Sequence, residues 1–308
     1  MEKVVLGLDL GGTKSAAVLA SADGVILARQ SAPTPVGADA SGLVDFLTEL
    51  AVAVRSGYAG NVVGVGVSAG APADAGRGLV FDAPNLPGWG SEGYPLAQAL
   101  SSRLDGLPVA LENDADATAL AEFRFGAGRG ARNLVFMTVG TGIGGGFILN
   151  GQLHRGKCGA GGEVGHIAVV PDGRPCKCGL RGCAEAYASG PSLTRIALEF
   201  GFVGEPTGPA VIAAARNGDP PARRAVEQAG EMLGRAIATL AMLLNPERVI
   251  LGTLAVHAGD LLLPIVSETV RVRAWSRVAD GLEIVPAALG DRAQDLAALS
   301  AFLERFSM

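Results

Sequence analysis

Three cysteines and a histidine lie close together in the middle of the chain and could bind a metal ion. Cys176, Cys178 and Cys183 fall within eight residues, in the pattern C-K-C-G-L-R-G-C, and His166 lies ten residues upstream. Three thiolates and one imidazole are the donor set of a closed, four-coordinate zinc site, which stabilises a fold and leaves no open position for chemistry. The alternative interpretation, a set of unrelated buried cysteines, would not require this spacing. The sequence therefore predicts a structural Zn²⁺ site.

Two carboxylates, Glu163 and Glu185, flank this cluster. A metal ion would hold the loop rigidly, so side chains at its edges would be fixed in position. We therefore interpret both glutamates as ligand-binding groups, while ordinary exposed surface charges remain the alternative.

Two glycine-rich turns, one in each half of the chain, have the composition of phosphate-binding loops. The first is D-L-G-G-T-K, with Asp9 at the end of an apolar run, and the second is G-T-G-I-G-G-G from Gly140. Glycines allow backbone N–H groups to approach phosphate oxygens, although a tight hairpin turn would explain the first equally well. Neither turn fits the Walker pattern or the dinucleotide fingerprint. Two such turns indicate a nucleotide held from both sides.

Asn113 and Asp114 follow the short apolar segment P-V-A-L-E, where a strand should meet a helix. An aspartate there can act as a general base for a substrate hydroxyl, but either residue could simply cap the helix. Asn85, in A-P-N-L-P-G-W, could bind a sugar hydroxyl or form an Asx-type turn.

The bulk composition limits the functional classes. The chain has 308 residues, of which 49% are hydrophobic, and a formal net charge of −5. This acidity argues against a broad nucleic-acid or anionic-lipid surface. No stretch has the length and apolarity of a membrane span, and the first apolar run is too short for a secretory signal, so we expect a cytoplasmic protein without membrane or nucleic-acid partners.

The hydrophobic pattern predicts an α/β protein. The chain opens as strand, loop, strand, turn and strand, and residues 133–151 repeat this succession of an apolar strand, a Gly/Thr loop, a second strand and a turn. Buried strands are expected at 62–68 and 249–252. One helix is expected to end near residue 104, and the others are expected at about 41–56, at 115–125, through most of 189–244 and at 292–306. The partial repeat indicates two similar α/β domains.

These motifs, in this order, resemble the ROK family (repressor, open reading frame, kinase), and within it the bacterial glucokinases. The resemblance rests on D-L-G-G-T-K, E-N-D-A-D, G-T-G-I-G-G-G, E-V-G-H and C-K-C-G-L-R-G-C-A-E and covers essentially the whole chain. It implies the actin-like ATPase (ribonuclease H-like) fold, with two α/β domains around a cleft and a structural zinc loop. The expected domains are residues 1–112 with 293–308, and residues 113–292.

The resemblance also implies ATP-dependent phosphorylation of a hexose, with glucose as the expected substrate, Mg²⁺ as the catalytic cofactor and a homo-oligomer of two or four chains. Asp114 would be the general base. The sugar would be surrounded by Asn85, Asn113, Asp114, Glu163, His166 and Glu185. The nucleotide phosphates and Mg²⁺ would be bound by Asp9, Gly11, Gly12, Thr13, Lys14, Gly140, Thr141 and Gly142, with Gly252 near the adenosine.

The chain departs from the family pattern at three positions. Gly252-Thr253-Leu254 stands where a run of glycines is usual, Gly70-Ala71 replaces a Pro-Gly step, and Asp116 replaces an asparagine. The departure at Gly252 leaves the phosphoryl donor open, with polyphosphate as an alternative to ATP. The sugar-pocket residues do not separate glucose from N-acetylmannosamine, fructose or allose. Two alternatives from other classes are a sugar-responsive regulator, which would need a DNA-binding module, and a non-catalytic sugar-binding protein.

Overall fold

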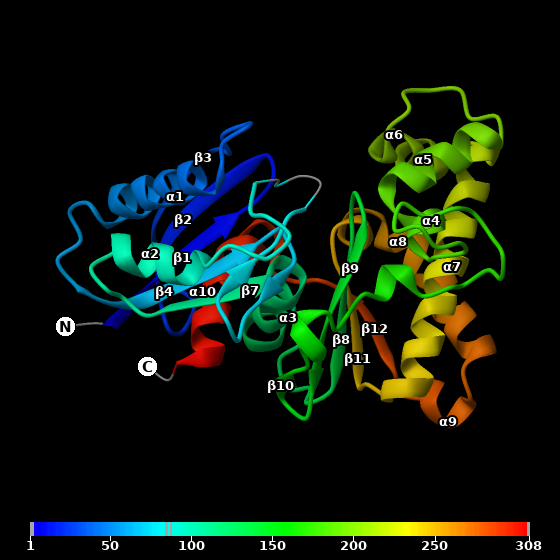
Figure 1. Cartoon of the computed structure of the whole chain (residues 1–308). Coiled ribbons are helices and arrows are strands. Elements are labelled where there is room, and N and C mark those ends of the chain that lie inside the picture. The colour runs from blue at the N-terminus through cyan, green and yellow to red at the C-terminus, as the bar shows by residue number, and fades with distance from the viewer. Residues whose placement is uncertain (1–2, 84–85, 87, 307–308) are drawn as a thin grey trace. The chain divides into compact units, whose positions relative to one another are not determined.

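A computed structural model describes residues 3–83, 86 and 88–306, which form two compact units (Figure 1). Unit 1 comprises residues 1–129, 155–161 and 289–308, and unit 2 comprises residues 130–154 and 162–288. These bounds differ from the expected domains, because residues 113–129 and the short segment 155–161 cluster with unit 1. Asn85 lies outside the described residues.

Unit 1 is built on a five-stranded sheet with the order β3-β2-β1-β4-β7. Strands β1, β2 and β3 are antiparallel neighbours, whereas β1, β4 and β7 are parallel. Alternate residues of β1 face opposite sides, so Val4 and Leu6 join one buried cluster and Val5 joins another. The strands are β1 (Lys3–Leu10), β2 (Lys14–Ser21), β3 (Ile26–Pro33), β4 (Asn61–Ala69) and β7 (Val109–Asn113).

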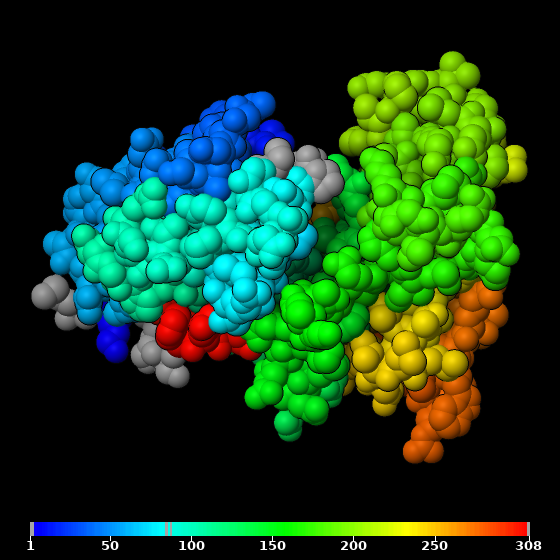
Figure 2. Space-filling model, viewed as in Figure 1, coloured from blue at the N-terminus to red at the C-terminus, as the bar shows by residue number. Residues whose placement is uncertain are grey.

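Helices cover both faces of this sheet. On one face lie α1 (Ala40–Arg55) and α2 (Leu96–Arg103), which form much of the viewed surface of unit 1 in Figure 2. On the other face lie α3 (Asp114–Phe125) and the last helix, α10 (Ala293–Arg305). The helix α10 packs so closely on β4 that a Cβ atom on Gly66 would lie 1.9 Å from the Ala298 carbonyl oxygen. The short strands β5 (Ala73–Asp74) and β6 (Leu79–Val80) form a separate pair.

Unit 2 repeats the same sheet plan. Its order is β10-β9-β8-β11-β12, again with three antiparallel neighbours followed by two parallel pairings. The partial repeat expected from the sequence is therefore confirmed as a repeat of topology. The strands are β8 (Leu134–Val139), β9 (Ile143–Leu149), β10 (Gln152–Leu153), β11 (Arg248–Leu251) and β12 (Glu283–Pro286).

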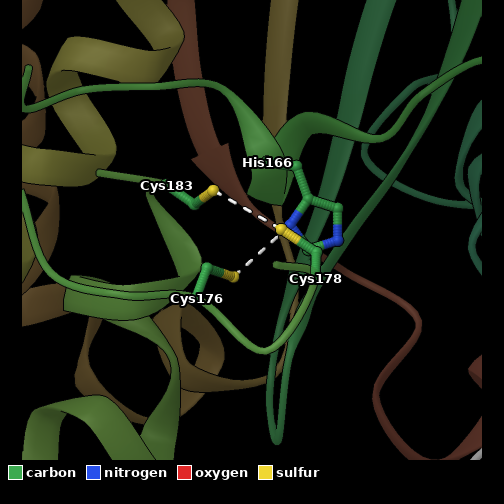
Figure 3. A group of neighbouring side chains, drawn as sticks. All are labelled: His166, Cys176, Cys178 and Cys183. Carbon is green, nitrogen blue, oxygen red and sulfur yellow. Dashed lines mark hydrogen bonds between the residues drawn. The ribbon is translucent and has the colours of Figure 1, made fainter. Parts of the chain in front are cut away.

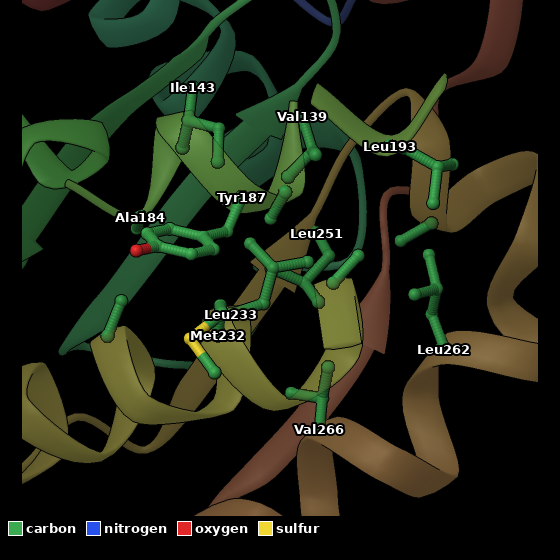
Figure 4. Packing of buried hydrophobic residues seen from close by; sticks show 14 of the residues in the cluster. Val139, Ile143, Ala184, Tyr187, Leu193, Met232, Leu233, Leu251, Leu262 and Val266 are labelled. Carbon is green, nitrogen blue, oxygen red and sulfur yellow. The ribbon is translucent and has the colours of Figure 1, made fainter. Parts of the chain in front are cut away.

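The helices of unit 2 pack around α7 (Pro220–Leu244), which pairs with α8 (Leu254–Arg273) (Figure 1). Figure 4 shows Leu233 of α7 and Val266 of α8 in the core that they share with Leu251 of β11. Three helices begin in the same way, with a Ser, Thr or Asp cap followed within two residues by proline, which suits the first helical turn. The remaining helices are α4 (Glu185–Ala188), α5 (Gly190–Glu199), α6 (Gly208–Arg216) and α9 (Ser276–Ala279).

The structure corrects one local expectation and adds elements that the sequence did not reveal. Strand β9 begins at Ile143, so Gly144, Gly145 and Gly146 lie in a strand and not in the turn. Helix α8 and strand β12 were not predicted from the pattern. In the described part of the chain, no helix combines the length and apolarity needed to cross a membrane.

Candidate active site

Asn113 lies at the end of β7 and is the N-cap of α3. Its side-chain oxygen accepts a hydrogen bond from the Ala115 N–H at 3.0 Å, and its Nδ2 donates to the Ala71 carbonyl oxygen at 3.2 Å. The capping alternative from the sequence is therefore confirmed. The second bond ties this cap to the loop that follows β4.

Asp114 is the first residue of α3 and is only partly exposed. Burial raises the pKa of its carboxyl above the ordinary 3.8, while hydrogen bonds from the Ala115 backbone and the Asn113 side chain oppose the rise. The helix N-terminus also favours the charged form. Gly70 of the loop after β4 lies next to the carboxylate, since a Cβ atom on it would be in van der Waals contact with Asp114 Oδ2 at 3.8 Å. An aspartate that is partly desolvated but still partly exposed is suited to accept a proton.

Asp9 lies near Asp114 in unit 1, at the end of β1 and before the first glycine turn. The pKa of Asp9 is raised to about 7, mainly by burial and also by the charges of Asp114 and Asp295, while the Ser68 hydroxyl and Arg29 oppose the rise. The residues after it, Gly11, Gly12 and Thr13, form the tight connection between antiparallel β1 and β2, and Lys14 begins β2 exposed. The hairpin alternative is therefore confirmed, and the turn remains accessible.

The second glycine turn, Gly140-Thr141-Gly142, joins β8 to β9 in the same way. Its Gly140 N–H donates to the Gly142 carbonyl at 2.9 Å. Gly145, further along β9, makes room for protein rather than for a ligand, because a Cβ on it would lie 2.7 Å from Val164 Cγ2 and 3.0 Å from the Gly162 carbonyl oxygen.

A cavity of about 1000 Å³ opens beside this turn within unit 2. Thr253 and Leu254 line it, whereas Gly252 is buried against the Phe136 ring. Thr253 has φ +49° and its hydroxyl lies 3.1 Å from the Thr138 hydroxyl. The lining is largely apolar and is formed by Val139, Gly140, Thr141, Gly190, Pro191, Thr194, Arg195, Leu198, Glu199, Pro206, Thr207, Gly208, Pro209, Ile212, Arg216, Thr253, Leu254 and His257.

The four predicted metal ligands converge in unit 2 (Figure 3). One potential ligand atom from each of His166, Cys176, Cys178 and Cys183 lies within 4.8 Å of the other three. Cys176 Sγ is 3.7 Å from His166 Nδ1, and Cys178 Sγ is 3.7 Å from Cys183 Sγ. A tetrahedral zinc ion with ordinary bond lengths separates its ligand atoms by about 3.6–3.8 Å. The donor set and spacing therefore fit Zn²⁺ with His166 bound through Nδ1.

Tight backbone turns bring the cysteines together. Gly182 has φ +78°, and a Cβ on it would lie 1.9 Å from the Val170 carbonyl oxygen, so only glycine fits there. The Cys176 N–H donates to the Leu180 carbonyl at 2.8 Å, and Cys183 forms a β-bridge with Ala168. The loop is thus held by its own backbone as well as by any bound metal.

The two glutamates that flank the loop lie in different surroundings. Glu185 Oε2 accepts a hydrogen bond from the Ile143 N–H at 2.9 Å, and its Oε1 lies 3.9 Å from Cys176 Sγ. Glu163 is exposed, with its Oε2 3.9 Å from His166 Nε2. Glu185 therefore connects the metal cluster to the second glycine turn, and Glu163 keeps an accessible carboxylate beside the imidazole.

Sequence reasoning missed one conspicuous pair, Arg155 and Glu112. The Arg155 guanidinium forms two hydrogen bonds from Nε, at 3.0 and 3.3 Å, and a shorter one from its terminal nitrogen to the buried Glu112 carboxylate. The sequence signal for this pair is a glutamate inside the apolar segment V-A-L-E-N, since a buried carboxylate requires a partner.

Comparison with known proteins gives a consistent result. Residues 5–304 match the ROK family. A glucokinase from Streptomyces coelicolor is 36% identical, with 94% of each chain covered. A ROK hexokinase structure from Thermus thermophilus superposes with a TM-score of 0.85 at 36% identity and 98% coverage of both chains. The structure of a ROK glucokinase from Streptomyces griseus in complex with glucose and AMPPNP superposes with a TM-score of 0.76, at 34% identity and 97% coverage of both chains.

The raised pKa of Asp9 predicts a stability effect that depends on pH. Between pH 3.8 and about 7 the unfolded state binds fewer protons at this residue than the folded state does, so its contribution to folding becomes less favourable as pH rises. We expect Asp9→Asn to increase the free energy of unfolding at pH 8 by up to roughly 4 kcal/mol and to have little effect at pH 4. Urea unfolding without Mg²⁺ measures this, and an equal change at both pH values would contradict it.

The metal cluster gives a second prediction. Cys176→Ser should release zinc from the purified protein and lower the melting temperature, because a structural metal contributes folding free energy. Lys177→Ser, at the exposed position between Cys176 and Cys178, is the matched control and should retain both. Elemental analysis and thermal unfolding measure the two effects. Wild-type protein purified without chelators and found free of zinc would refute the site.

Proposed function

This chain belongs to the ROK family, and on that premise we propose that it transfers the γ-phosphoryl group of ATP to glucose, giving glucose 6-phosphate. The observation that carries the proposal is Asp114, a carboxylate at the start of α3 that is partly desolvated and yet remains partly exposed. The full-length likeness to glucokinases supports the choice of reaction and of sugar.

In the proposed reaction, Asp114 accepts the proton of the sugar hydroxyl. The hydroxyl oxygen forms a bond to the γ-phosphorus while the bond from that phosphorus to the β-phosphate bridging oxygen breaks, and its electron pair leaves with ADP. The proton on Asp114 then passes to solvent. Because the ordinary pKa of an aspartate is too low for an effective base at neutral pH, the rise caused by burial favours this role.

The phosphates would bind to backbone N–H groups of the two hairpin turns, Gly11–Thr13 and Gly140–Gly142, with Lys14 supplying a positive charge. Asp9, which lies near Asp114, offers a carboxylate oxygen ligand of the kind that Mg²⁺ prefers. When bound, Mg²⁺ would neutralise charge on the transferring phosphoryl group.

The sugar would be bound by Asn113 and Asp114 together with Glu163, His166 and Glu185. The hydrogen bond of Glu185 with Ile143 supports this role, because it fixes that side chain beside the zinc loop, and Glu163 places an accessible carboxylate near His166. Bound zinc would act only by holding this loop. Asn85 remains a proposed additional sugar contact.

The cavity of unit 2 favours a nucleotide donor over polyphosphate. An extended polyanion requires several unpaired cations, but Arg216 is paired with Asp260, and Arg195 donates to the Ala186 carbonyl at 2.7 Å beside Glu199. A largely apolar cavity next to a phosphate-binding turn suits an adenine base with its ribose.

We also propose that the chain forms a homo-oligomer. Exposed apolar side chains gather where α7 and α8 end, and the Trp275 N–H lies 3.4 Å from Met242 Sδ. Such a patch is typical of a protein interface. Its members are Met242, Leu243, Val272 and Trp275.

Asp114→Asn tests the proposed base. The variant keeps the size of the side chain but cannot accept the proton, so we expect kcat to fall by about 10²–10⁴-fold while glucose affinity stays within a few-fold. Asp116→Asn, two residues further along the same helix, is the control and should retain most activity. Stopped-time ADP release and calorimetric glucose binding measure the two quantities. If Asp114→Asn retained more than about a tenth of the wild-type rate, Asp114 would not be the base.

A panel of sugars tests the reaction itself. With ATP and Mg²⁺ we expect the highest kcat/KM for glucose, compared with N-acetylmannosamine, fructose and allose, and little turnover with polyphosphate as donor. A higher value for another hexose would reassign the substrate. Measurable sugar binding without turnover on any sugar would instead indicate a non-catalytic sugar-binding protein.

A further inference from the structure

The chain enters unit 1 for only seven residues in the middle of unit 2. Residues 155–161, which we call the bracing segment, belong to unit 1, whereas residues 130–154 and 162–288 belong to unit 2. The segment closes on itself through a hydrogen bond from the Gly161 N–H to the Arg155 carbonyl at 2.8 Å. Glu163, a proposed sugar ligand, follows it by two residues.

One end of the bracing segment is anchored by an ion pair with a buried partner. Arg155 is bound through two of its nitrogens to Glu112, whose side chain is 5% exposed, while the Arg155 side chain is 32% exposed. Burial raises the pKa of Glu112, and the hydrogen bonds and charge of Arg155 lower it. Glu112 would therefore be a costly buried charge without Arg155.

The rest of the segment packs against the loop after β4. Gly159 has φ +72°, and a Cβ on it would lie 2.2 Å from the Ala73 carbonyl oxygen, so the two backbones are in direct contact. Ala71, two residues before Ala73, accepts the hydrogen bond from Asn113. Glu112 precedes Asn113 directly. The bracing segment thus contacts both chain stretches that the Asn113 side chain joins.

Resting on the proposed function, we propose that Arg155 and Glu112 are positioning residues for the sugar site, which hold the bracing segment against β7 and the loop after β4 and so fix Asn113 and Asp114. Neither residue touches the reacting atoms. A buried ion pair contributes little net stability compared with apolar residues of similar size, so the geometry that it imposes explains its presence better than stability does. Bidentate binding supplies that geometry, which a lysine would not reproduce.

The test is the double variant Glu112→Gln with Arg155→Met. Removing both charges avoids an unpaired buried carboxylate, so the melting temperature should stay within a few degrees of wild type. Without the anchor, KM for glucose should rise roughly tenfold or more while KM for ATP changes less than about threefold. Hydrogen exchange of residues 155–161 should become faster.

A matched control pair lies in the same unit. Arg124 and Glu304 form an ion pair at 2.8 Å between α3 and α10, with side chains 30% and 15% exposed. Arg124→Met with Glu304→Gln should leave KM for glucose unchanged. Arg155→Lys keeps the charge but loses the bidentate bond, so it should raise KM for glucose with little loss of stability. This variant replaces the double variant in the test if the double variant does not fold.

Two outcomes would overturn the inference. One is an unchanged KM for glucose in both Arg155 variants, which would make the pair structural only. The other is an equal rise in the Arg124 and Glu304 control. If the wild-type protein binds glucose but transfers no phosphoryl group, the proposed function fails, and the glucose dissociation constants of the same variants still decide the role of the pair.

Discussion

A contact between two backbones sets the arrangement of unit 2 around its metal cluster. A Cβ on Gly162 would lie 2.4 Å from the Gly145 carbonyl oxygen, and one on Gly165 would lie 2.2 Å from the Ile143 carbonyl oxygen. No Cβ atom fits at Gly162 or Gly165, so the chain that leads to His166 lies directly on β9. At the other end of the loop, Glu185 accepts a hydrogen bond from Ile143 at the start of the same strand. Both ends of the zinc loop are therefore fixed to the strand that follows the second glycine turn.

Much of this arrangement could be predicted from the sequence, but its causes could not. Apolar runs located most strands, and the spacing of Cys176, Cys178 and Cys183 indicated the cysteines that converge with His166, because both signals are local. The glycines after Thr141 were interpreted as room for a ligand, whereas Gly145 makes room for Val164. Glu112 and Arg155 are 43 positions apart in the sequence. Their ion pair was not predicted, because a long-range partner leaves no local pattern.

The carboxylates of unit 1 fall into two groups. Glu112 and Asp295 are almost fully buried, and each pairs with an arginine: Arg155 binds Glu112 through two nitrogens, and Arg29 binds both oxygens of Asp295 through Nε. Asp9 and Asp114 have no such ion pair among the described residues, and burial raises the pKa of both. Paired carboxylates are suited to hold structure, whereas unpaired ones remain available to bind a cation or to move a proton.

The repeated sheet plan has a consequence for the order in which the chain can fold. In each unit the last strand of the sheet, β7 or β12, is followed by a helix, and both of those helices, α3 and α10, pack on the same face of unit 1. Phe302 and Ala298 of α10 occupy the space that the missing side chains of Gly64 and Gly66 leave open. During synthesis from the ribosome, domains usually fold in the order in which they emerge. Here the first unit to emerge would be the last to complete its core, because that core waits for the final helix of the chain.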